Sequence, residues 1–500
     1  MATMAHAETR WDFDRLLIGG NWVEPTGGRT YEVPNPATDR SIGHAPEGTR
    51  EDMQRAIAAA RKAFDEGPWP RSSKHDRARV LNRIADALEA RKEEWRALLI
   101  AEAGACWVSH DVQVEWPIRH LRNYADLVFR FPFEEMLPST VTGSPMGAYV
   151  SNSMVHHAPV GVCGMIPTWN FPMFVIAQKI GPALATGNTM VIKPSPYGPL
   201  VNLWLAKLIE DVADLPPGVI NWVTGQSPEI SQELVSNAMV DKVSFTGSIV
   251  VGRQILAAAA DRLRRVHLEL GGKSAHILLD GDNLDMVAPA LAAPSFFHSG
   301  QGCAMGTRIL VPKSVADKAV EKMAAFVSNR DIVKIGDPAD PSVLMGPVIR
   351  EERRKAIEAY IESGVDQGAR LVTGGRRPAQ LSSGYFLEPT IFADVDNKLK
   401  IAQEEIFGPV VTVTAYGDLD EAARIANDSD YGLAAMITGS DQVKALELGK
   451  RLRTGTVWIN QGGNMAHAPF GGFKLSGIGR EGGLYGMHEY TEIQHLAWRS

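Results

Sequence analysis

Residues 160–270 alternate between short apolar segments and segments of helical periodicity, and this alternation constrains the fold more than any other feature of the chain. The turns between the segments are short and contain Gly or Pro. Such an alternation predicts a doubly wound, Rossmann-like α/β sheet. The expected strands are residues 160–166, 189–193, 219–223, 242–245 and 266–270, and the expected helices are residues 171–184, 200–212, 230–237 and 250–260.

The carboxyl ends of these strands carry polar residues, and ligands bind at those ends in a sheet of this kind. Ser248 follows a strand and opens a helix, so the free N–H groups there could bind phosphate. A helix capped by Ser248 without any ligand is the alternative. A Gly-x-Gly-x-x-Gly pattern at residues 477–482 is not expected to bind a nucleotide, because the segment before it reads as a loop.

Three of these strand-end residues each allow two interpretations. Glu269 could be a general base for water or the ion-pair partner of Lys273. Asn170 could donate its side-chain amide to an oxyanion or cap the helix that follows. Lys193 could meet a phosphate or ribose hydroxyl, or be a solvated surface lysine.

A second α/β region is expected after residue 271, with a strand at 275–279, a helix to 297 and a strand at 309–311. Cys303 lies between that helix and the last strand, in a loop rich in glycine. A thiol on such a loop can act as a nucleophile, and its backbone N–H can face an oxyanion. A small buried hydrophobic residue is the alternative.

Composition excludes several classes of protein. The formal net charge is −7 and there is no basic block, so no nucleic-acid partner is expected. The three cysteines, Cys106, Cys163 and Cys303, are far apart, which argues against a metal site and for a reducing compartment. Polar residues and prolines interrupt the apolar region 159–191, so no membrane span is expected. Residues 1–15 lack the apolar core of a secretory signal. A cytoplasmic location follows.

Residues 138–157 read as a β-ribbon in which apolar and small polar residues alternate. A two-stranded ribbon is seldom stable alone. The ribbon therefore covers a partner surface or adds a pair of edge strands within the same chain.

Segments along nearly the whole chain resemble the aldehyde dehydrogenase superfamily, and they occur in the order found in that family. The likeness runs from Asn35-Pro-Ala-Thr38 to Glu489-Tyr-Thr-Glu492. The segments between them are Pro167-Thr-Trp-Asn-Phe-Pro172, Gly181-Pro-Ala-Leu-Ala-Thr-Gly-Asn188, Val191-Ile-Lys-Pro-Ser195, Phe245-Thr-Gly-Ser248, Leu268-Glu-Leu-Gly-Gly-Lys273, Gly300-Gln-Gly-Cys303, Glu404-Glu-Ile-Phe-Gly-Pro409 and Pro469-Phe-Gly-Gly472.

The resemblance implies oxidation of an aldehyde to the carboxylic acid, with hydride transfer to NAD(P)+. The Cys303 thiolate would attack the aldehyde carbon. The Asn170 amide and the Cys303 N–H would hold the oxyanion. A thioester would remain after hydride transfer, and Glu269 would activate the water that hydrolyses it.

The resemblance also implies the cofactor site. Glu405 would hold the nicotinamide ribose and Phe407 would pack by the nicotinamide. NAD is favoured, but Pro196 stands where many NAD-dependent relatives carry Glu, so NADP is not excluded. The cofactor-binding residues expected are Ile166, Trp169, Lys193, Ser195, Gly225, Gly247, Ser248, Val251, Glu405 and Phe407.

The substrate is expected to be a medium-sized or bulky aldehyde, because the loop at residues 461–467 is rich in glycine and lacks aromatic residues. His298 is either a pocket residue or a structural one. The pocket residues expected are Trp116, Phe171, Met173, Gln178 and Phe297.

Three domains are expected by resemblance. Residues 1–137 and 158–270 would form the NAD(P)-binding domain, and residues 271–483 a catalytic α/β domain. Residues 138–157 and 484–500 would form a β-ribbon domain that joins copies into a homodimer or homotetramer.

Two other functions share this scaffold: a non-catalytic structural protein and an acyl-transferring reductase. The intact set of Cys303, Glu269 and Asn170 argues against the first. Glu269 argues against the second, because acylating relatives typically lack this base.

Overall fold

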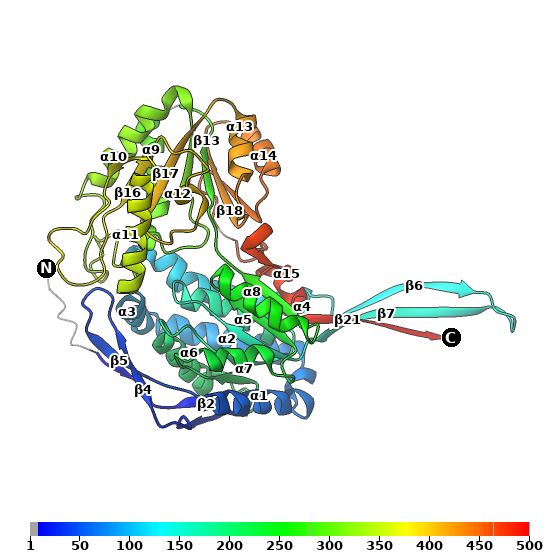
Figure 1. The fold of residues 1–500 in the computed structure, drawn as a ribbon. Coiled ribbons are helices and arrows are strands. Elements are labelled where there is room, and N and C mark those ends of the chain that lie inside the picture. Colours follow the sequence, from blue (N-terminus) through cyan, green and yellow to red (C-terminus); the bar gives the residue numbers. More distant parts are fainter. Residues whose placement is uncertain (1–8, 282, 464, 500) are drawn as a thin grey trace.

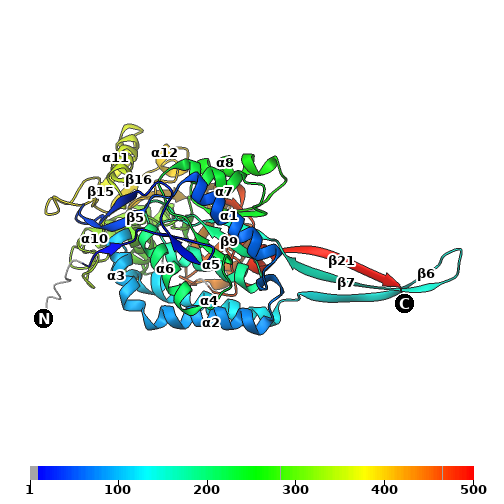
Figure 2. The same cartoon turned by 90° about the horizontal axis from the view of Figure 1, so that it is seen from below.

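The computed structural model describes residues 9–281, 283–463 and 465–499. The expected domain ranges that include residues 1–8 or 500 therefore extend beyond the described residues, as does position 464 of the glycine-rich loop. Figure 1 shows two lobes, each built on a sheet, and both Figures 1 and 2 show a thin arm that projects from one side.

The chain begins with short strands and four long helices that pack around the first lobe (Figure 2). Apolar residues at helical spacing predict helical structure across residues 73–102, but it is interrupted, because Arg91 leaves helical geometry at φ −113° and ψ 19°. The sequence also predicts a helical run at residues 113–129, and this run begins as a π-helical turn, Asp111–Glu115. These elements are β1 (Trp11–Asp12), β2 (Leu16–Ile18), β3 (Asn21–Val23), β4 (Thr30–Pro34), β5 (Ser41–Pro46), α1 (Arg50–Asp65), α2 (Lys74–Ala90), α3 (Lys92–Ala103) and α4 (Trp116–Arg130).

The alternating region forms the first sheet, and the strand–helix alternation expected from the sequence is confirmed. Its elements are β8 (Val162–Ile166), α5 (Pro172–Ala185), β9 (Thr189–Ile192), α6 (Pro199–Val212), β10 (Ile220–Trp222), α7 (Pro228–Ser236), β11 (Lys242–Thr246), α8 (Ile249–Ala260) and β12 (Arg265–Glu269), joined at one edge by β20 (Gly477–Ile478). The strand order is β20-β12-β11-β8-β9-β10-β2-β3. The five central strands are parallel. The order reverses between β8 and β11, where a doubly wound sheet leaves a crevice for ligands.

Side chains on the two faces of this sheet enter different cores. Cys163 and Met165 of β8 belong to the core that includes residues of α4, α5 and α6. Val162 and Ile166 of the same strand belong to the core that includes residues of α1, α7 and α8. This alternation buries both faces of the parallel strands, which is why they read as nearly continuous apolar runs.

The second lobe contains a seven-stranded sheet with the order β15-β16-β17-β14-β13-β18-β19. All neighbouring pairs are parallel except β15 with β16. Its elements are β13 (Ala275–Leu278), α9 (Leu284–Phe296), β14 (Arg308–Pro312), α10 (Ala316–Ser328), α11 (Glu351–Asp366), β15 (Arg370–Thr373), β16 (Thr390–Ala393), α12 (Lys400–Gln403), β17 (Val410–Tyr416), α13 (Leu419–Asn427), β18 (Ala434–Thr438), α14 (Gln442–Arg451) and β19 (Thr456–Ile459).

The projecting arm is a three-stranded antiparallel sheet made of β6 (Glu134–Thr142), β7 (Tyr149–Pro159) and β21 (Thr491–Arg499). The short helix α15 (Gly483–His488) leads into β21. Segments far apart in the sequence thus meet in the arm, as Figure 1 shows. Within the described part of the chain, no helix is both long and apolar enough to cross a membrane.

Candidate active site

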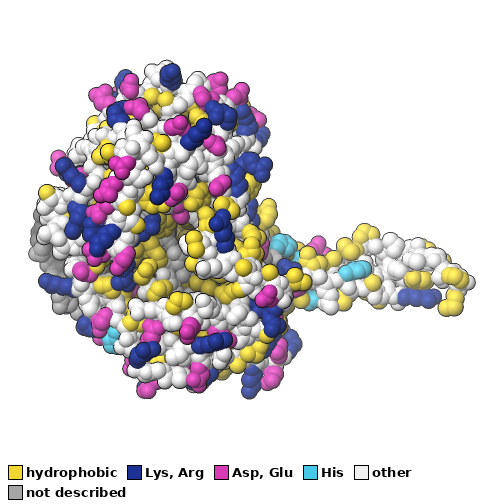
Figure 3. All heavy atoms as spheres, in the orientation of Figure 1, with side chains coloured by type: hydrophobic (Ala, Val, Ile, Leu, Met, Phe, Trp, Pro, Cys, Tyr) yellow, Lys and Arg dark blue, Asp and Glu magenta, His cyan; other side chains and the backbone are white. Residues whose placement is uncertain are grey.

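A cavity of about 1200 Å³ lies between the two lobes, and the three residues expected to be catalytic all line it. Asn170 follows β8, Glu269 ends β12, and Cys303 lies in the loop between α9 and β14. Figure 3 shows a hollow between the lobes with many apolar side chains around it. The two sheets therefore bring together groups that are well separated in the sequence.

Cys303 follows a tightly turned backbone segment. His298 and Ser299 have φ values of 48° and 55°, in the left-handed region. Gly300 follows at φ 73°, and a Cβ there would lie 2.1 Å from the carbonyl oxygen of Gly408. Such backbone is strained for residues other than glycine, so the surrounding structure must hold it in place. The Ser299 hydroxyl contributes by donating a hydrogen bond to the carbonyl of Gly346, at 2.6 Å.

Cys303 is the only partly exposed cysteine, since Cys106 and Cys163 are buried. Burial raises the pKa of the Cys303 thiol, and the charges of Glu269 and Glu405 raise it further. The backbone N–H groups of Cys303 and Ala304 oppose this rise in pKa. They also show that N–H donors face the sulfur, as an oxyanion site beside it requires.

The side-chain amide of Asn170 is held toward the cysteine loop. Its Nδ2 donates to the backbone carbonyl of Gln301 at 2.8 Å, and the backbone carbonyl of Asn170 accepts from Nε2 of Gln113 at 2.8 Å. Asn170 is buried. The helix-cap alternative is not observed, because Phe171 occupies the N-cap of α5 and no side chain caps it.

Glu269 is buried, and its Oε1 has no hydrogen-bond partner. Nζ of Lys273 also has none, so the ion pair between the two residues is not observed. Burial raises the pKa of Glu269 well above its usual range, and the charge of Glu481 adds to this, whereas Lys179 and Arg480 oppose it. A buried carboxylate with an unpartnered oxygen and a raised pKa has the properties of a general base.

Glu405 and Phe407 line the cavity from the second lobe. The Oε1 atom of Glu405 accepts a hydrogen bond from the N–H of Gly272 at 3.0 Å. Burial raises the pKa of Glu405 to about 7, and this hydrogen bond opposes the rise. The Phe407 ring lies edge-on to that of Trp169, with centroids 5.7 Å apart. Together they form one wall of the cavity.

The expected cofactor residues divide into two groups. Trp169, Gly247, Ser248, Glu405 and Phe407 line the cavity. Ser248 also caps α8, where its hydroxyl accepts from the N–H of Val251 at 3.4 Å. The other five are not part of the lining: Ile166, Lys193, Ser195, Gly225 and Val251. Ile166 and Lys193 are buried, and Val251 is exposed on α8.

Sequence reasoning missed several residues on the cofactor side of the cavity. Tyr197 lines it and packs against Trp169 at 6.5 Å. Its place just after the end of β9 was a usable signal. Arg350 and Arg353 also line the cavity. They lie at the start of α11, in the second lobe, and no motif marks them.

On the substrate side, Phe171, Gln178 and Phe297 line the cavity. The rings of Phe171 and Phe297 are stacked, with centroids 6.5 Å apart and an interplanar angle of 13°. Phe174 and Val175 also line it. These α5 residues share one helical stripe, so periodicity could have found them.

Two expected pocket residues lie outside the cavity lining. Met173 is buried in the core of the first lobe, because it lies on a different face of α5 from the cavity-lining stripe. Trp116 packs behind Phe174, with ring centroids 5.5 Å apart, and does not line the cavity. His298 is buried 5.4 Å from the Phe171 ring and is not part of the lining, which fits the structural alternative. Val112, Trp458 and Phe470 line the cavity without having been expected.

Among the described residues, no group of three or more His, Cys, Asp or Glu side chains could hold a metal ion. The free N–H groups at the start of α8 and the Glu405 carboxylate instead suit a ligand with phosphates and ribose hydroxyls. The residues present therefore fit a dinucleotide.

Comparison with known proteins identifies close relatives over nearly the whole length. A family model described as the aldehyde dehydrogenase family matches residues 22–496. A 3-succinoylsemialdehyde-pyridine dehydrogenase from Pseudomonas sp is 40% identical over 97% of this chain and 98% of that protein. A mitochondrial aldehyde dehydrogenase from Sus scrofa is 41% identical over 96% of this chain and 90% of its own length.

Solved structures agree with these relatives. The crystal structure of Mycobacterium tuberculosis aldehyde dehydrogenase complexed with NAD+ superposes with a TM-score of 0.91 at 39% identity. It covers 97% of this chain and 98% of that one. Betaine aldehyde dehydrogenase from Staphylococcus aureus in complex with NAD+ has a TM-score of 0.93 at 36% identity, covering 97% and 95%.

Proposed function

The chain belongs to the aldehyde dehydrogenase family, and we propose that its NAD-dependent oxidation of an aldehyde to the acid is carried out by Cys303, Asn170 and Glu269. The observation that supports this assignment is their convergence. All three side chains line one cavity, and Glu269 presents an oxygen without a hydrogen-bond partner.

The proposed chemistry begins at sulfur. The Cys303 thiolate attacks the aldehyde carbon, and the carbonyl electrons move onto oxygen. The Asn170 amide and the Cys303 N–H stabilise this oxyanion. NAD+, when bound, supplies a nicotinamide that accepts the hydride. Collapse of the tetrahedral adduct leaves a thioester on Cys303.

Glu269 then completes the reaction. It takes a proton from a water molecule, whose oxygen attacks the thioester carbon. The carbon–sulfur bond breaks, the acid leaves and the thiolate is restored. Only the ionised form of Glu269 can accept the proton. Its raised pKa makes it a stronger base than an exposed glutamate, at the cost of a smaller ionised fraction.

Residues of both lobes that line the cavity with Cys303 would hold the cofactor. Gly247 and Ser248 would hold the pyrophosphate at the positive end of α8. Glu405 would bind the nicotinamide ribose, with Phe407 beside the ring. Of the expected residues outside the lining, Lys193 is buried after β9, where burial lowers the pKa of its ammonium to about 8.

We propose an uncharged, medium-sized or bulky aldehyde as substrate. The support is the aromatic and aliphatic character of the wall near Cys303, formed by Phe171, Phe174, Val175 and Phe297. Gln178 adds one neutral polar group. Burial against such side chains favours apolar substrate groups by about 0.8 kcal/mol for each CH₂.

We also propose the domain division and a homodimer or homotetramer assembled through the arm. The arm exposes Met146 at 89%, Val141 at 76% and Ile493 at 69%, and a second copy of the chain would cover such side chains. Residues 138–157 and 484–500 would form this domain, beside the cofactor domain of residues 1–137 and 158–270 and the catalytic domain of residues 271–483. The free thiols of Cys106, Cys163 and Cys303 support a cytoplasmic location.

The test is the appearance of reduced-nicotinamide absorbance when the purified protein is mixed with NAD+ or NADP+ and a panel of aliphatic, aromatic and charged aldehydes. Turnover with NAD+ and bulky neutral aldehydes is expected. Preference for charged aldehydes would contradict the proposed substrate class. No turnover in a folded protein with a titratable thiol would favour a non-catalytic scaffold.

A further inference from the structure

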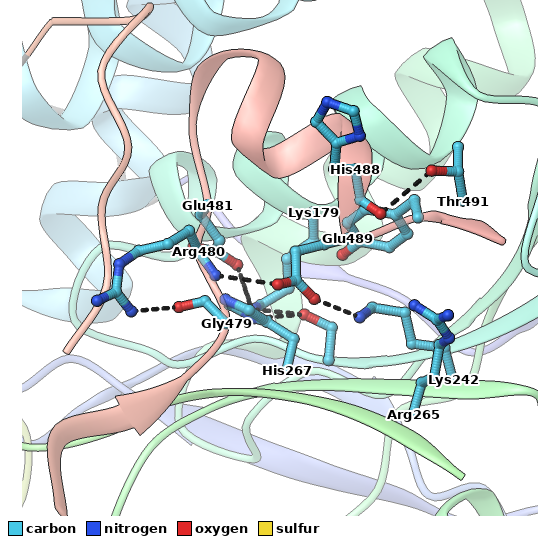
Figure 4. Close-up of polar contacts among 12 residues, drawn as sticks. Lys179, Lys242, Arg265, His267, Gly479, Arg480, Glu481, His488, Glu489 and Thr491 are labelled. Carbon is cyan, nitrogen blue, oxygen red and sulfur yellow. Dashed lines mark hydrogen bonds and ion pairs between the residues drawn. The ribbon is translucent and has the colours of Figure 1, made fainter. Parts of the chain in front are cut away.

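His267 lies two residues before Glu269 on β12, so the two side chains project from the same face of the strand. Figure 4 shows His267 among the buried polar side chains of this region. The imidazole is buried, at 1% exposure. None of the steps derived above uses it.

Two unpartnered atoms face one another here. Nε2 of His267 has no hydrogen-bond partner, and neither has Oε1 of Glu269. The distance between them is 3.9 Å. An unsatisfied buried polar atom costs about 1–3 kcal/mol, so two of them side by side call for an explanation.

The other ring nitrogen points toward acceptors. Nδ1 of His267 lies 3.3 Å from the hydroxyl oxygen of Ser244 and 3.6 Å from Oε1 of Glu481. Nζ of Lys179 donates to both of these oxygens, at 3.0 and 2.7 Å. Because the nearer acceptors lie at Nδ1, we place the ring proton there, which leaves the lone pair on Nε2, the nitrogen 3.9 Å from Glu269 Oε1.

Burial and the surrounding positive charges keep the imidazole neutral. Burial lowers the pKa of His267 well below its usual value, and Lys179, Lys242 and Arg480 lower it further. Glu481 is paired with Lys179, and Glu489 is paired with Lys242 at 3.0 Å. The groups that face this site from the adjoining elements are Lys179 on α5, Lys242 and Ser244 on β11, Arg480 and Glu481 after β20, Glu489 and Tyr490 after α15, and Tyr124 on α4.

We propose that His267 is a positioning residue for the general base, whose Nε2 accepts a hydrogen bond from Glu269 once Glu269 has taken the proton of the attacking water. This inference rests on the proposed function. No proton leaves Glu269 in this step. The imidazole offers an acceptor that only the protonated form of Glu269 can use.

The arrangement explains how Glu269 serves two states. As a carboxylate it has the neutral ring beside Oε1 and no hydrogen-bond donor there, so this oxygen stays free for water. As an acid it gains a partner, and a hydrogen bond to the neutral form of a carboxyl group raises its proton affinity. Ser244 and the Lys179–Glu481 pair hold the ring in the tautomer that this requires. The proton returns to solvent through the cavity, which Glu269 and Glu481 both line.

The test compares His267→Leu with His267→Gln in single-turnover and steady-state measurements. Leu removes the acceptor, so thioester hydrolysis should slow about tenfold or more, while the initial burst of NADH keeps its rate. The acidic limb of the pH profile of kcat should move down by about half a pH unit or more, because the neutral form of Glu269 loses its partner. Gln retains an acceptor oxygen, and its hydrolysis rate should stay within about threefold of wild type.

A matched control is His276→Leu. His276 is also buried, at 2% exposure, but its Nε2 pairs with Thr438 at 2.9 Å in the second lobe. That variant should lose stability without moving the pH midpoint. If His267→Leu does not fold, Ser244→Ala serves instead. It keeps the ring and removes the nearest acceptor at Nδ1, so a smaller shift in the same direction is expected.

Three results would each overturn a claim. A normal NADH burst with an unshifted midpoint, in His267→Leu or in its substitute Ser244→Ala, overturns the role of His267 and leaves the proposed function intact. Absence of both a burst and a thioester from wild-type protein overturns the proposed function itself. An equal shift in His276→Leu would show a general effect of losing a buried histidine, and would also overturn the inference.

Discussion

The two carboxylates that flank Cys303 differ in what holds them. Glu405, from the second lobe, accepts the Gly272 N–H at 3.0 Å; burial raises its pKa, and this hydrogen bond, Arg353 and Lys273 oppose the rise. Glu269, from the first lobe, leaves Oε1 unpartnered beside a neutral imidazole, and the charge of Glu481 raises its pKa. Residues of one type thus become an anchor at one end of the cavity and a base at the other.

The physical difference is whether the carboxylate oxygens accept hydrogen bonds from the protein. A carboxylate whose oxygen is fixed by a backbone donor has a fixed position and can orient a ligand. A carboxylate with an oxygen left over can still accept a proton. Variants at each end should therefore fail at different steps of the reaction.

Removal of the nucleophile should have the largest effect, because the steps that depend on Glu269 and on Glu405 both need Cys303. Cys303→Ala should lower turnover by about three orders of magnitude or more, since no other described cysteine reaches the cavity. NAD+ binding, measured by fluorescence titration, should remain close to wild type because the Glu405 end is intact. Cys106→Ala is the control and should retain turnover. Near-normal turnover of Cys303→Ala would refute the nucleophile assignment.

Loss of the base should block only the second half of the reaction. Glu269→Gln should slow thioester hydrolysis by about 10²–10⁴-fold. A burst of NADH should remain, and the trapped thioester should be visible by mass spectrometry. The wild-type rate of hydrolysis should rise with pH through the raised pKa of Glu269, and the variant should lose this dependence. An unchanged steady-state rate would point to a different base.

Loss of the anchor should give the opposite signature. Glu405→Gln should slow hydride transfer by about 10–100-fold, because without the Glu405 contact the nicotinamide would less often lie where it can accept the hydride. KM for NAD+ should rise, and no thioester should accumulate. Rapid-mixing absorbance distinguishes this outcome from that of Glu269→Gln. A burst followed by slow turnover in both variants would remove the functional contrast between the two ends.

The smallest expected effect is on stability. A glutamate whose pKa is raised on folding contributes stability that is present below its unfolded pKa and lost as pH rises through the folded pKa. For Glu405 this window runs from about 4.5 to about 7. The free energy of unfolding of both proteins should fall between pH 5 and pH 8. The fall should be about 1 kcal/mol smaller in Glu405→Gln than in wild type, after allowance for the partial exposure of Glu405. Urea titrations at both pH values measure it. An equal loss in both proteins would contradict the raised pKa.

Much of the secondary structure of the first lobe could be predicted, because it follows from residue patterns within short segments. A buried parallel strand must be apolar at nearly every position, and the helix between two such strands must be amphipathic. The expected strands and helices of residues 160–270 are therefore found close to their predicted places. The break at Arg91 was missed, since helical periodicity continues across it.

Residues that line the cavity were predictable where a motif or a strand end marks them, as with Cys303, Glu269 and Asn170. Arg353 and Trp458 line the same cavity with no local signal. Met173 was misplaced because apolar character does not say whether a side chain faces a cavity or a core. The helical periodicity of residues 171–178 would have distinguished the cavity-facing residues from the core-facing Met173.

The sequence by itself determined the α/β class, the order of the segments and the chemical groups available for catalysis, because periodicity and residue type are local properties. Only the tertiary structure decided which alternatives hold. In the structure Glu269 does not pair with Lys273, and the Asn170 amide donates to the cysteine loop. His267 lies between Glu269 and Glu481. These outcomes depend on distances between side chains from different strands and lobes, and packing fixes those distances only once the two sheets have met.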